Sequence, residues 1–279
     1  MEGEITMATL VAEKTLSADQ VAGFHKDGYI IVRNLIAPAE ITELRAETDR
    51  LYALGSIPGC FKAVPLAEAK AQGDILLAYP RMMHPHRVSD VAMRYMLHPA
   101  YADILRALLG EDAIAAQSMY YWKPPTGRGQ AFHQDNFYLK VHPGTCIASW
   151  LAMDEIDEEN GCLFVAPGSH LLDVFCPEEA DLTVSFSKQF VPVPEGLEKV
   201  PVHMAPGDVL FFGGNLIHGS NPNRSANRFR RSYICHYAGV SAHELSKYYF
   251  PLYDMQGREV LRDIAIGGGP CGAEAKAPH

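Results

Sequence analysis

The spacing of hydrophobic residues along this chain changes near Gly110. Before that point apolar residues recur every three or four positions, which predicts amphipathic helices. These helices are predicted over residues 17–26, 38–54, 89–97 and 99–109, with a first strand over 29–35. After that point short runs rich in aromatic and β-branched residues predict strands. These strands are predicted over residues 114–122, 132–139, 145–153, 161–165, 200–204, 208–212 and 229–237.

Turn residues such as Pro206-Gly207 and Asn221-Pro222 separate the predicted strands. Many short strands with regular turns indicate a mainly β fold, a double-stranded β-helix (jelly-roll) core with flanking N-terminal α-helices. We expect a single domain over residues 1–279. Its parts are a helical region over about 17–110, a jelly-roll core over about 111–240 and a C-terminal extension over 241–279.

Two stretches follow neither periodicity. Residues 56–87 mix glycine, proline, alanine and lysine, and we expect a long loop, part of which borders the active site. The tail from Gly267 onward has few side chains that could pack, so we expect it to fray or to form a flexible flap.

Composition and charge narrow the class of protein. The chain has 279 residues, of which 48% are hydrophobic and 20% charged, as in a globular protein with a sizeable core. Its formal net charge of -9 argues against binding to nucleic acid or to an anionic membrane. No run approaches the roughly 18 apolar residues that span a bilayer. We therefore expect a small-molecule partner, and whether the chain forms a homodimer stays open.

The cysteines and the N-terminus favour a cytoplasmic protein. Six cysteines are scattered along the chain without a CxxC pair, which predicts free thiols in a reducing compartment rather than disulfides. The first residues, MEGEITMATLVAEK, are acidic and lack the cationic and long apolar regions of a secretory signal.

Two short polar segments could carry metal chemistry: AFHQD at 131–135 and LIHGSN at 216–221. In an extended strand His133 and Asp135 share one face, because residues two apart point the same way. If a distant strand adds His218, two imidazoles and one carboxylate cover one face of an octahedral iron(II) and leave three positions open. An HxD pair alone arises easily by chance. The glycines beside His218 strengthen the hypothesis because they allow close approach to a ligand.

A basic cluster follows His218 and consists of Arg224, Arg228, Arg230 and Arg231. If the metal binds a 2-oxo acid, the far carboxylate needs a fixed cation, and a guanidinium binds it with two hydrogen bonds. Arg224 and Arg228 fit an ordinary solvated turn. Arg230 instead begins a predicted strand, where it shares one face with Ser232.

Several motifs in order resemble the phytanoyl-CoA dioxygenase family of iron(II)- and 2-oxoglutarate-dependent oxygenases. They are KPP at 123–125, FHQDNFYL at 132–139, SWLAMDEIDEENGCLFVAPGSH at 149–170, MAPGDVLFF at 204–212 and HGSNPNRSANRFRRSYICHY at 218–237. The resemblance extends from the N-terminal helices to about Tyr237. It implies iron(II), 2-oxoglutarate and O₂ as cofactor and cosubstrates, and His133, Asp135 and His218 as the catalytic iron ligands.

The resemblance also implies roles around the cosubstrate. Arg230 matches the arginine that pairs with the distal carboxylate of 2-oxoglutarate, with Arg228 as a rival because the preceding loop is one residue longer than usual. Ser220 matches a hydroxyl that shares this carboxylate, and Trp150 an aromatic wall. Gln117 matches a polar side chain over the metal or cosubstrate. His84 or Arg87 could reach the cosubstrate from the preceding loop.

The implied reaction is oxidation of an unactivated C–H bond, most simply hydroxylation, with desaturation and ring closure left open. Related halogenases lack the ligand carboxylate, so the presence of Asp135 favours oxygen insertion. The residues expected at the cavity mouth are Tyr79, Arg81, His84, Tyr120, Trp122, Asn136, Tyr138 and the run 248–250. Their mixture suits a small organic molecule such as a secondary-metabolite intermediate.

Three alternatives stay open. An acyl-CoA substrate would favour a basic phosphate-binding patch, against which the overall acidity argues weakly. A cupin-type hydrolase or isomerase with zinc or manganese would not explain the arginine cluster. A non-catalytic small-molecule-binding protein on the same fold would not need an intact ligand triad.

Overall fold

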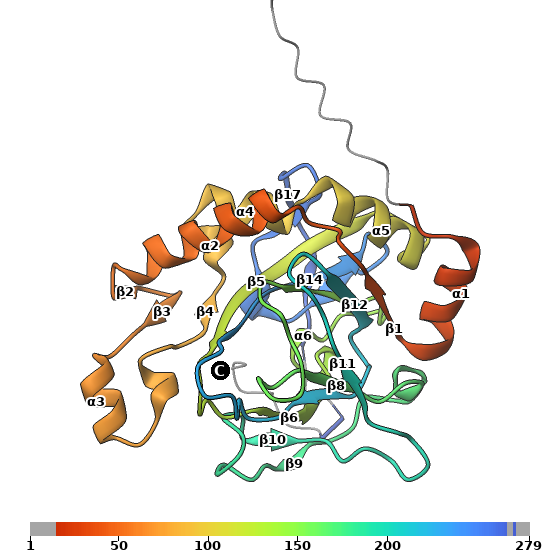
Figure 1. Ribbon diagram of the computed structural model, residues 1–279. Helices are drawn as coiled ribbons and strands as arrows, with labels where there is room; N and C mark the ends of the chain where they lie inside the picture. The colour runs from red at the N-terminus through yellow and green to blue at the C-terminus, as the bar shows by residue number, and fades with distance from the viewer. Residues whose placement is uncertain (1–14, 267–269, 272–279) are drawn as a thin grey trace, which may run out of the picture.

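Two β-sheets that face each other form the core of this computed structural model, which describes residues 15–266 and 270–271 (Figure 1). The larger sheet has the order β1-β12-β7-β14-β5-β16-β17, with β4 also paired to β5. The smaller sheet has the order β11-β8-β13-β6. The jelly-roll prediction is confirmed.

The strands of the larger sheet are β1 (Tyr29–Val32), β4 (Met82–Met83), β5 (Ala113–Lys123), β7 (Ile147–Ala152), β12 (Val209–Gly213), β14 (Arg230–Gly239), β16 (Leu252–Asp254) and β17 (Glu259–Val260). Those of the smaller sheet are β6 (Gln130–His133), β8 (Leu163–Val165), β11 (Val200–Val202) and β13 (His218–Ser220). Three two-stranded pairs are β2 (Ser56–Ile57) with β3 (Phe61–Lys62), β9 (Glu178–Glu179) with β10 (Gln189–Phe190), and β15 (Glu244–Leu245) with β18 (Asp263–Ile264).

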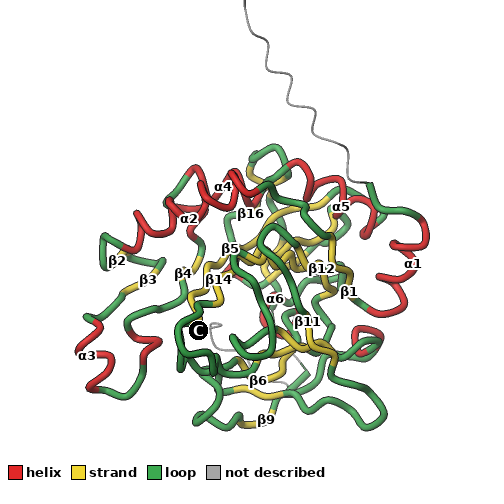
Figure 2. The backbone as a smooth tube through the Cα atoms, viewed as in Figure 1, coloured by secondary structure: helices red, strands yellow, loops and turns green. Residues whose placement is uncertain are grey.

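The helices gather on the outer side of the larger sheet, away from the smaller one (Figure 2). They are α1 (Ala18–Asp27), α2 (Pro38–Tyr52), α4 (Asp90–Met96) and α5 (Pro99–Leu109). The alternation of side chains along β14 explains how the helices contact the larger sheet. Tyr233 and Tyr237 point toward the helices and donate hydrogen bonds of 2.7 Å to the carbonyls of Ala92 and Met96. Ile234 and His236, which alternate with them, are therefore directed into the space between the sheets.

The expected capping box of α1 is present, because Ser17 and Gln20 bond each other's backbone amides. The prediction of a long loop over residues 56–87 is only partly right. Besides β2, β3 and β4, it contains α3 (Leu66–Ala71) and the 3-10 helices η1 (Ile75–Leu77) and η2 (Pro85–Arg87). Elements this short carry too little periodicity to be recognised in a sequence. Further 3-10 helices are η3 (Ser169–Leu171) and η4 (Lys247–Tyr249).

The strand expected over 132–139 is wrong beyond its first residues. β6 ends at His133, and Asp135 already has helical backbone angles as the cap of the one-turn helix α6 (Asn136–Leu139). The expectation that Tyr120 faces the cavity is also wrong, because Tyr120 packs into the cluster between β5 and the helices. The inward-facing residue is its neighbour Tyr121.

The prediction of free thiols is wrong for one pair, since Cys176 and Cys271 form a disulfide. The other four cysteines, Cys60, Cys146, Cys162 and Cys235, are free and buried. The tail from Gly267 lies outside the described residues, apart from Pro270 and Cys271. Within residues 15–266 and 270–271, no helix is long and apolar enough to cross a membrane.

Gly219 sets the spacing between the two strands that carry the histidines of the HQD and HGSN motifs. A Cβ atom added there would lie 2.9 Å from the backbone nitrogen of Phe132 and 3.0 Å from the carbonyl oxygen of Gln130. Both atoms belong to the β6 backbone, which cannot move aside like a flexible side chain. β13 therefore packs closely on β6 only with glycine at this position.

We expect Gly219→Ala to lower the free energy of unfolding by about 1–3 kcal/mol, because the added methyl group overpacks two backbones. Urea denaturation measures this change. Gly23→Ala is the matched control: its Cβ meets nothing within 4 Å, and it lies inside α1. That variant should be more stable than wild type by about 0.5–1 kcal/mol, since alanine favours a helix. An unchanged stability of Gly219→Ala contradicts the argument.

Candidate active site

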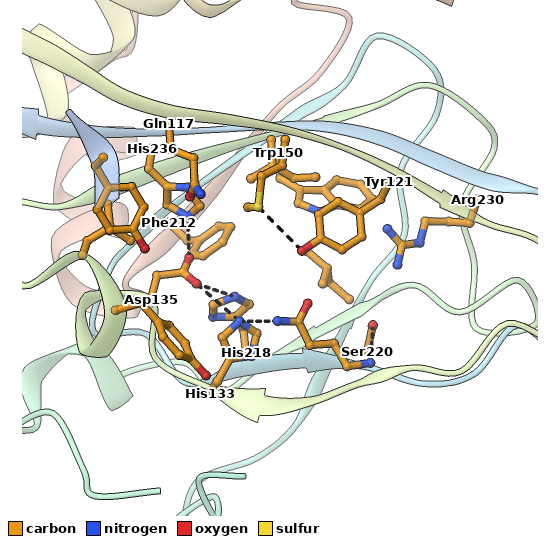
Figure 3. Close-up of a pocket in the computed structure, with 17 residues that line it drawn as sticks. Gln117, Tyr121, His133, Asp135, Trp150, Phe212, His218, Ser220, Arg230 and His236 are labelled. Atoms are coloured by element: carbon orange, nitrogen blue, oxygen red, sulfur yellow. Dashed lines mark hydrogen bonds and ion pairs between the residues drawn. The ribbon is translucent and has the colours of Figure 1, made fainter. Parts of the chain in front are cut away.

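Three potential metal ligands converge between the sheets. His133 ends β6, Asp135 follows in the next turn, and His218 begins β13, directly opposite His133 in the antiparallel register. Their ligand atoms all lie within 4.8 Å of one another, and all three residues are buried. The Asp135 Oδ1 atom is 3.3 Å from His133 Nε2 and 3.7 Å from His218 Nε2 (Figure 3). The predicted triad is thus assembled from two strands and a helical turn.

Backbone carbonyls fix the orientation of both imidazoles. His133 Nδ1 lies 2.9 Å from the carbonyl oxygen of Ala131, and His218 Nδ1 lies 2.9 Å from that of Leu216. A carbonyl only accepts, so each Nδ1 carries the hydrogen and each Nε2 presents its lone pair. Burial lowers the pKa of His218 to about 4 despite the nearby Asp135, which favours this neutral form. Neutral imidazoles of this tautomer are metal ligands.

His236 orients the carboxylate. Its Nε2 atom lies 2.9 Å from Asp135 Oδ2 and can donate to it, which leaves Oδ1 for a metal. Although burial raises the pKa of Asp135, the imidazoles of His218 and His236 hold it well below its usual range. The sequence analysis missed His236. The alternation of side chains along β14 could have identified His236, because it places this residue on the same face as Arg230.

The register of β5 and β14 arranges the interior in rows. Lys123 pairs with Arg230, Tyr121 with Ser232, Met119 with Ile234, and Gln117 with His236. The last row lies beside Asp135. In the first row Arg230 lines the far end of the same cavity, whereas Lys123 lies behind Ser220, to which it bonds, and lines a neighbouring cavity. The cavity therefore has a metal end and a cationic end.

Lys123 and Arg230 form the cationic end, and both are buried. Lys123 Nζ donates hydrogen bonds to Ser220 Oγ at 2.8 Å, to the carbonyl of Asn221 at 2.7 Å and to that of Gly161 at 3.3 Å. Arg230 Nη1 donates to Ser232 Oγ at 3.0 Å. The sequence analysis assigned no role to Lys123, although it lies within the KPP motif and shares its face with Gln117.

Arg230 lacks the partner that a buried guanidinium needs. Its Nε has no hydrogen bond, and its guanidinium carbon lies 5.2 Å from the centre of the Trp150 ring. Among the described residues neither Arg230 nor Lys123 forms a salt bridge. Burial lowers the pKa of Arg230 to about 10 and, more strongly, that of Lys123. Because unpaired buried charges are costly, this end of the cavity fits a bound carboxylate.

Ser220 is prepared to donate to the same carboxylate. Its Oγ accepts hydrogen bonds from Lys123 Nζ at 2.8 Å and from the backbone nitrogen of Gln130 at 3.2 Å. A hydroxyl has two lone pairs and one hydrogen, so only its hydrogen is left to donate. Ser220 lines the cavity next to Arg230 (Figure 3).

The rival arginine is already paired. Arg228 binds Asp157 at 2.8 Å and Glu159 at 2.6 Å outside the cavity, and these carboxylates raise its pKa. Trp150 and Gln117 line the cavity as expected, whereas His84 and Arg87 line a neighbouring one.

Two larger cavities adjoin the metal-containing one. The first, of about 340 Å³, shares Tyr121 with it and is walled by Arg81, Phe186 and other side chains. The second, of about 540 Å³, shares Gln117 and Tyr249 with it. We call these the Tyr121 cavity and the Tyr249 cavity. The segment 56–87, which we expected to border the active site in part, contributes to both of these adjoining cavities but does not line the metal-containing one.

Comparison with known proteins places the chain in a family. It is 29% identical over 245 residues to a probable phytanoyl-CoA dioxygenase of Caenorhabditis elegans, covering 80% of this chain and 75% of that protein. It is 27% identical over 267 residues to a methylphosphonate hydroxylase of Gimesia maris, covering 91% and 95%. The crystal structure of EctD from S. alaskensis with 2-oxoglutarate and 5-hydroxyectoine superposes with a TM-score of 0.64 at 25% identity, covering 84% of this chain and 79% of that one.

The family model of phytanoyl-CoA dioxygenase (PhyH) matches residues 24–232, which include the triad, Lys123 and Arg230. The match begins in α1 and ends within β14, so it includes the whole smaller sheet, the larger sheet except β16, β17 and most of β14, and the helices α2, α4 and α5. The chain belongs to the phytanoyl-CoA dioxygenase family of iron(II)- and 2-oxoglutarate-dependent oxygenases.

Proposed function

We propose that His133, Asp135 and His218 hold iron(II) and that the enzyme hydroxylates an unactivated C–H bond of a small organic molecule, such as a secondary-metabolite intermediate. One observation carries the proposal. A buried, metal-competent triad and a buried Arg230 without a salt bridge line opposite ends of one cavity, and a second buried cation, Lys123, lies behind Ser220 at the Arg230 end. A 2-oxo acid with a second carboxylate suits both ends, since it can chelate the metal and neutralise the cations.

The protein residues position the cosubstrate and exclude water. Arg230 and the Ser220 hydroxyl bind the distal carboxylate, while Lys123 holds Ser220 and adds positive charge. Trp150 packs along the chain of the cosubstrate, and Gln117 lies above the metal end. Iron and 2-oxoglutarate supply the oxidising chemistry, with release of succinate and CO₂. The apolar side chains of Met119, Phe212 and Ile234 keep the site dry.

We further propose one oxygenase domain and a cytoplasmic location. Four buried thiols are typical of a reducing compartment. The disulfide between Cys176 and Cys271 is the contrary observation, but both residues are exposed, so a cytosolic reductant can reach the bond.

We expect an anaerobic titration with iron(II) and then 2-oxoglutarate to give the weak visible metal-to-ligand absorption. Arg230→Gln should weaken 2-oxoglutarate binding by about 10–100-fold, because it removes hydrogen bonds to a buried charge. Arg228→Gln is the matched control and should bind as wild type does, since Arg228 is paired with Asp157 and Glu159 outside the cavity. A folded wild type without the band overturns the proposed function.

Lys123→Met should weaken 2-oxoglutarate binding about tenfold in the same titration, because Ser220 loses its anchor and the cavity loses a charge. Iron(II) affinity should stay near that of wild type, since Lys123 lies at the opposite end from the triad. Urea denaturation separates this effect from a general loss of stability. A variant that is merely less stable, with unchanged 2-oxoglutarate affinity, shows that Lys123 has only a structural role.

His236→Phe should lower iron(II) affinity by about 10–100-fold, as expected when the partner of a ligating carboxylate is removed. His236→Gln keeps a donor that can reach Asp135 and should restore part of the affinity. Competition with a chromophoric chelator measures both constants. Equal iron affinity of the Phe variant and wild type would show that Asp135 needs no orientation.

A further inference from the structure

The Tyr249 cavity lies at the metal end of the active site. The two residues that it shares with the metal cavity are Gln117, which pairs with His236 on the adjacent strand, and Tyr249. His236 in turn bonds Asp135. The Tyr121 cavity instead opens beside Tyr121 and Lys123, along the path toward Arg230. A substrate must present its C–H bond to the metal, so the Tyr249 cavity is better placed to hold it.

Two cationic side chains and one imidazole line the Tyr249 cavity. Lys62 comes from the β2–β3 hairpin, Arg87 from η2, and His84 precedes η2. Among the residues that the structure describes, no Asp or Glu lines this cavity, although the whole chain carries a formal charge of -9. The basic character is therefore local and opposite to that of the protein as a whole.

Arg87 has capacity for a ligand. Among the described residues its guanidinium makes one hydrogen bond, in which Nη2 donates to the carbonyl of Phe250 at 2.8 Å, and no salt bridge. This bond fixes the guanidinium at the cavity wall and leaves its other N–H groups to donate. His84 supplies no charge, because burial lowers its pKa to about 3, but its buried Nδ1 has no partner.

The remaining wall is apolar and aromatic. Ile57, Phe61, Met83 and Tyr248 line it together with Tyr249. The volume of about 540 Å³ falls within the range of pockets for small organic ligands. One end of the ligand is thus expected to be apolar and directed to the metal, and the other to be charged.

We propose that the substrate is an organic anion whose acidic group, a carboxylate or a phosphate, is held by Arg87 with support from Lys62, while its apolar part extends past Gln117 and Tyr249 to the iron. This inference rests on the proposed function. It assigns Arg87 to substrate selection rather than to the cosubstrate, whose carboxylate has its own cations in Arg230 and Lys123.

The test compares an acid with its neutral analogue. Binding of 4-phenylbutanoate and of 4-phenylbutanamide to the anaerobic iron(II)–2-oxoglutarate complex is measured by calorimetry. Wild type should bind the acid about fivefold more tightly, as expected for a partly solvated ion pair. Arg87→Gln should remove most of this preference. Arg81→Gln is the matched control, because Arg81 lines the Tyr121 cavity and also lacks a salt bridge among the described residues; it should keep the preference.

Each outcome of this comparison either supports or overturns the inference. A wild type that binds the acid no better than the amide, or binds neither, overturns the inference. Loss of the preference in Arg81→Gln but not in Arg87→Gln places the anion in the Tyr121 cavity and also overturns it. The visible cosubstrate band, recorded in the same samples, reports on the proposed function separately. If Arg87→Gln loses that band, Arg87 serves the cosubstrate and the inference fails.

Displacement of the acid by coenzyme A identifies phosphate as the anionic group; no displacement identifies carboxylate.

Discussion

The rest of the site depends on the burial of two positive charges that form no salt bridge with any carboxylate of residues 15–266. Lys123 and Arg230 are directly opposite each other on β5 and β14, and both point between the sheets. Such a pair is costly in the protein alone, so part of the folding energy is stored as affinity for an anion. The metal triad has the opposite requirement at the other end of the cavity. There Asp135 bears a negative charge beside imidazoles, which suits a metal cation. One cavity is thereby polarised along its length, and a cosubstrate has only one favourable direction in it.

This polarity follows from strand alternation. Along β14 every second residue faces the helices, and Tyr233 and Tyr237 bond carbonyls of α4 there. The alternate residues Ile234 and His236 face the cavity, so the outward tyrosines also fix which face of the strand carries Arg230 and His236. A shift by one residue would bury the helix-facing phenols in the active site and turn both functional side chains outward. The packing of the outer helices and the chemistry inside are therefore set by the same register.

The sequence was sufficient to predict the fold, and the structure brings the predicted triad, Arg230, Ser220, Trp150 and Gln117 to one cavity. The alternating short strands predicted the jelly roll, and the strand beginning at Arg230 correctly separated this residue from Arg228. His236 and Lys123 were missed because their importance lies in partners from other strands, Asp135 and Ser220, which no local pattern encodes. Asp135 was expected on a strand, whereas it begins a helical turn. The outcome was the same because either backbone directs its carboxylate toward His133. The pairing of Cys176 with Cys271 likewise depends on a distant contact.

The metal-containing cavity and the Tyr249 cavity are built largely from different parts of the fold. His133, His218, the orienting His236 and the cationic end come from strands of the two sheets, whose register allows little change, and Asp135 follows β6 directly. Most walls of the Tyr249 cavity come instead from the β2–β3 hairpin, from η2 and from the segment around Tyr249. The two facing sheets contribute Gln117 of β5 and Met83 of the edge strand β4. Changes of side chain in these peripheral elements leave the metal and cosubstrate geometry intact. Substrate choice can thus vary on this fold without disturbing the chemistry, because the residues that select and the residues that react are held by different parts of the chain.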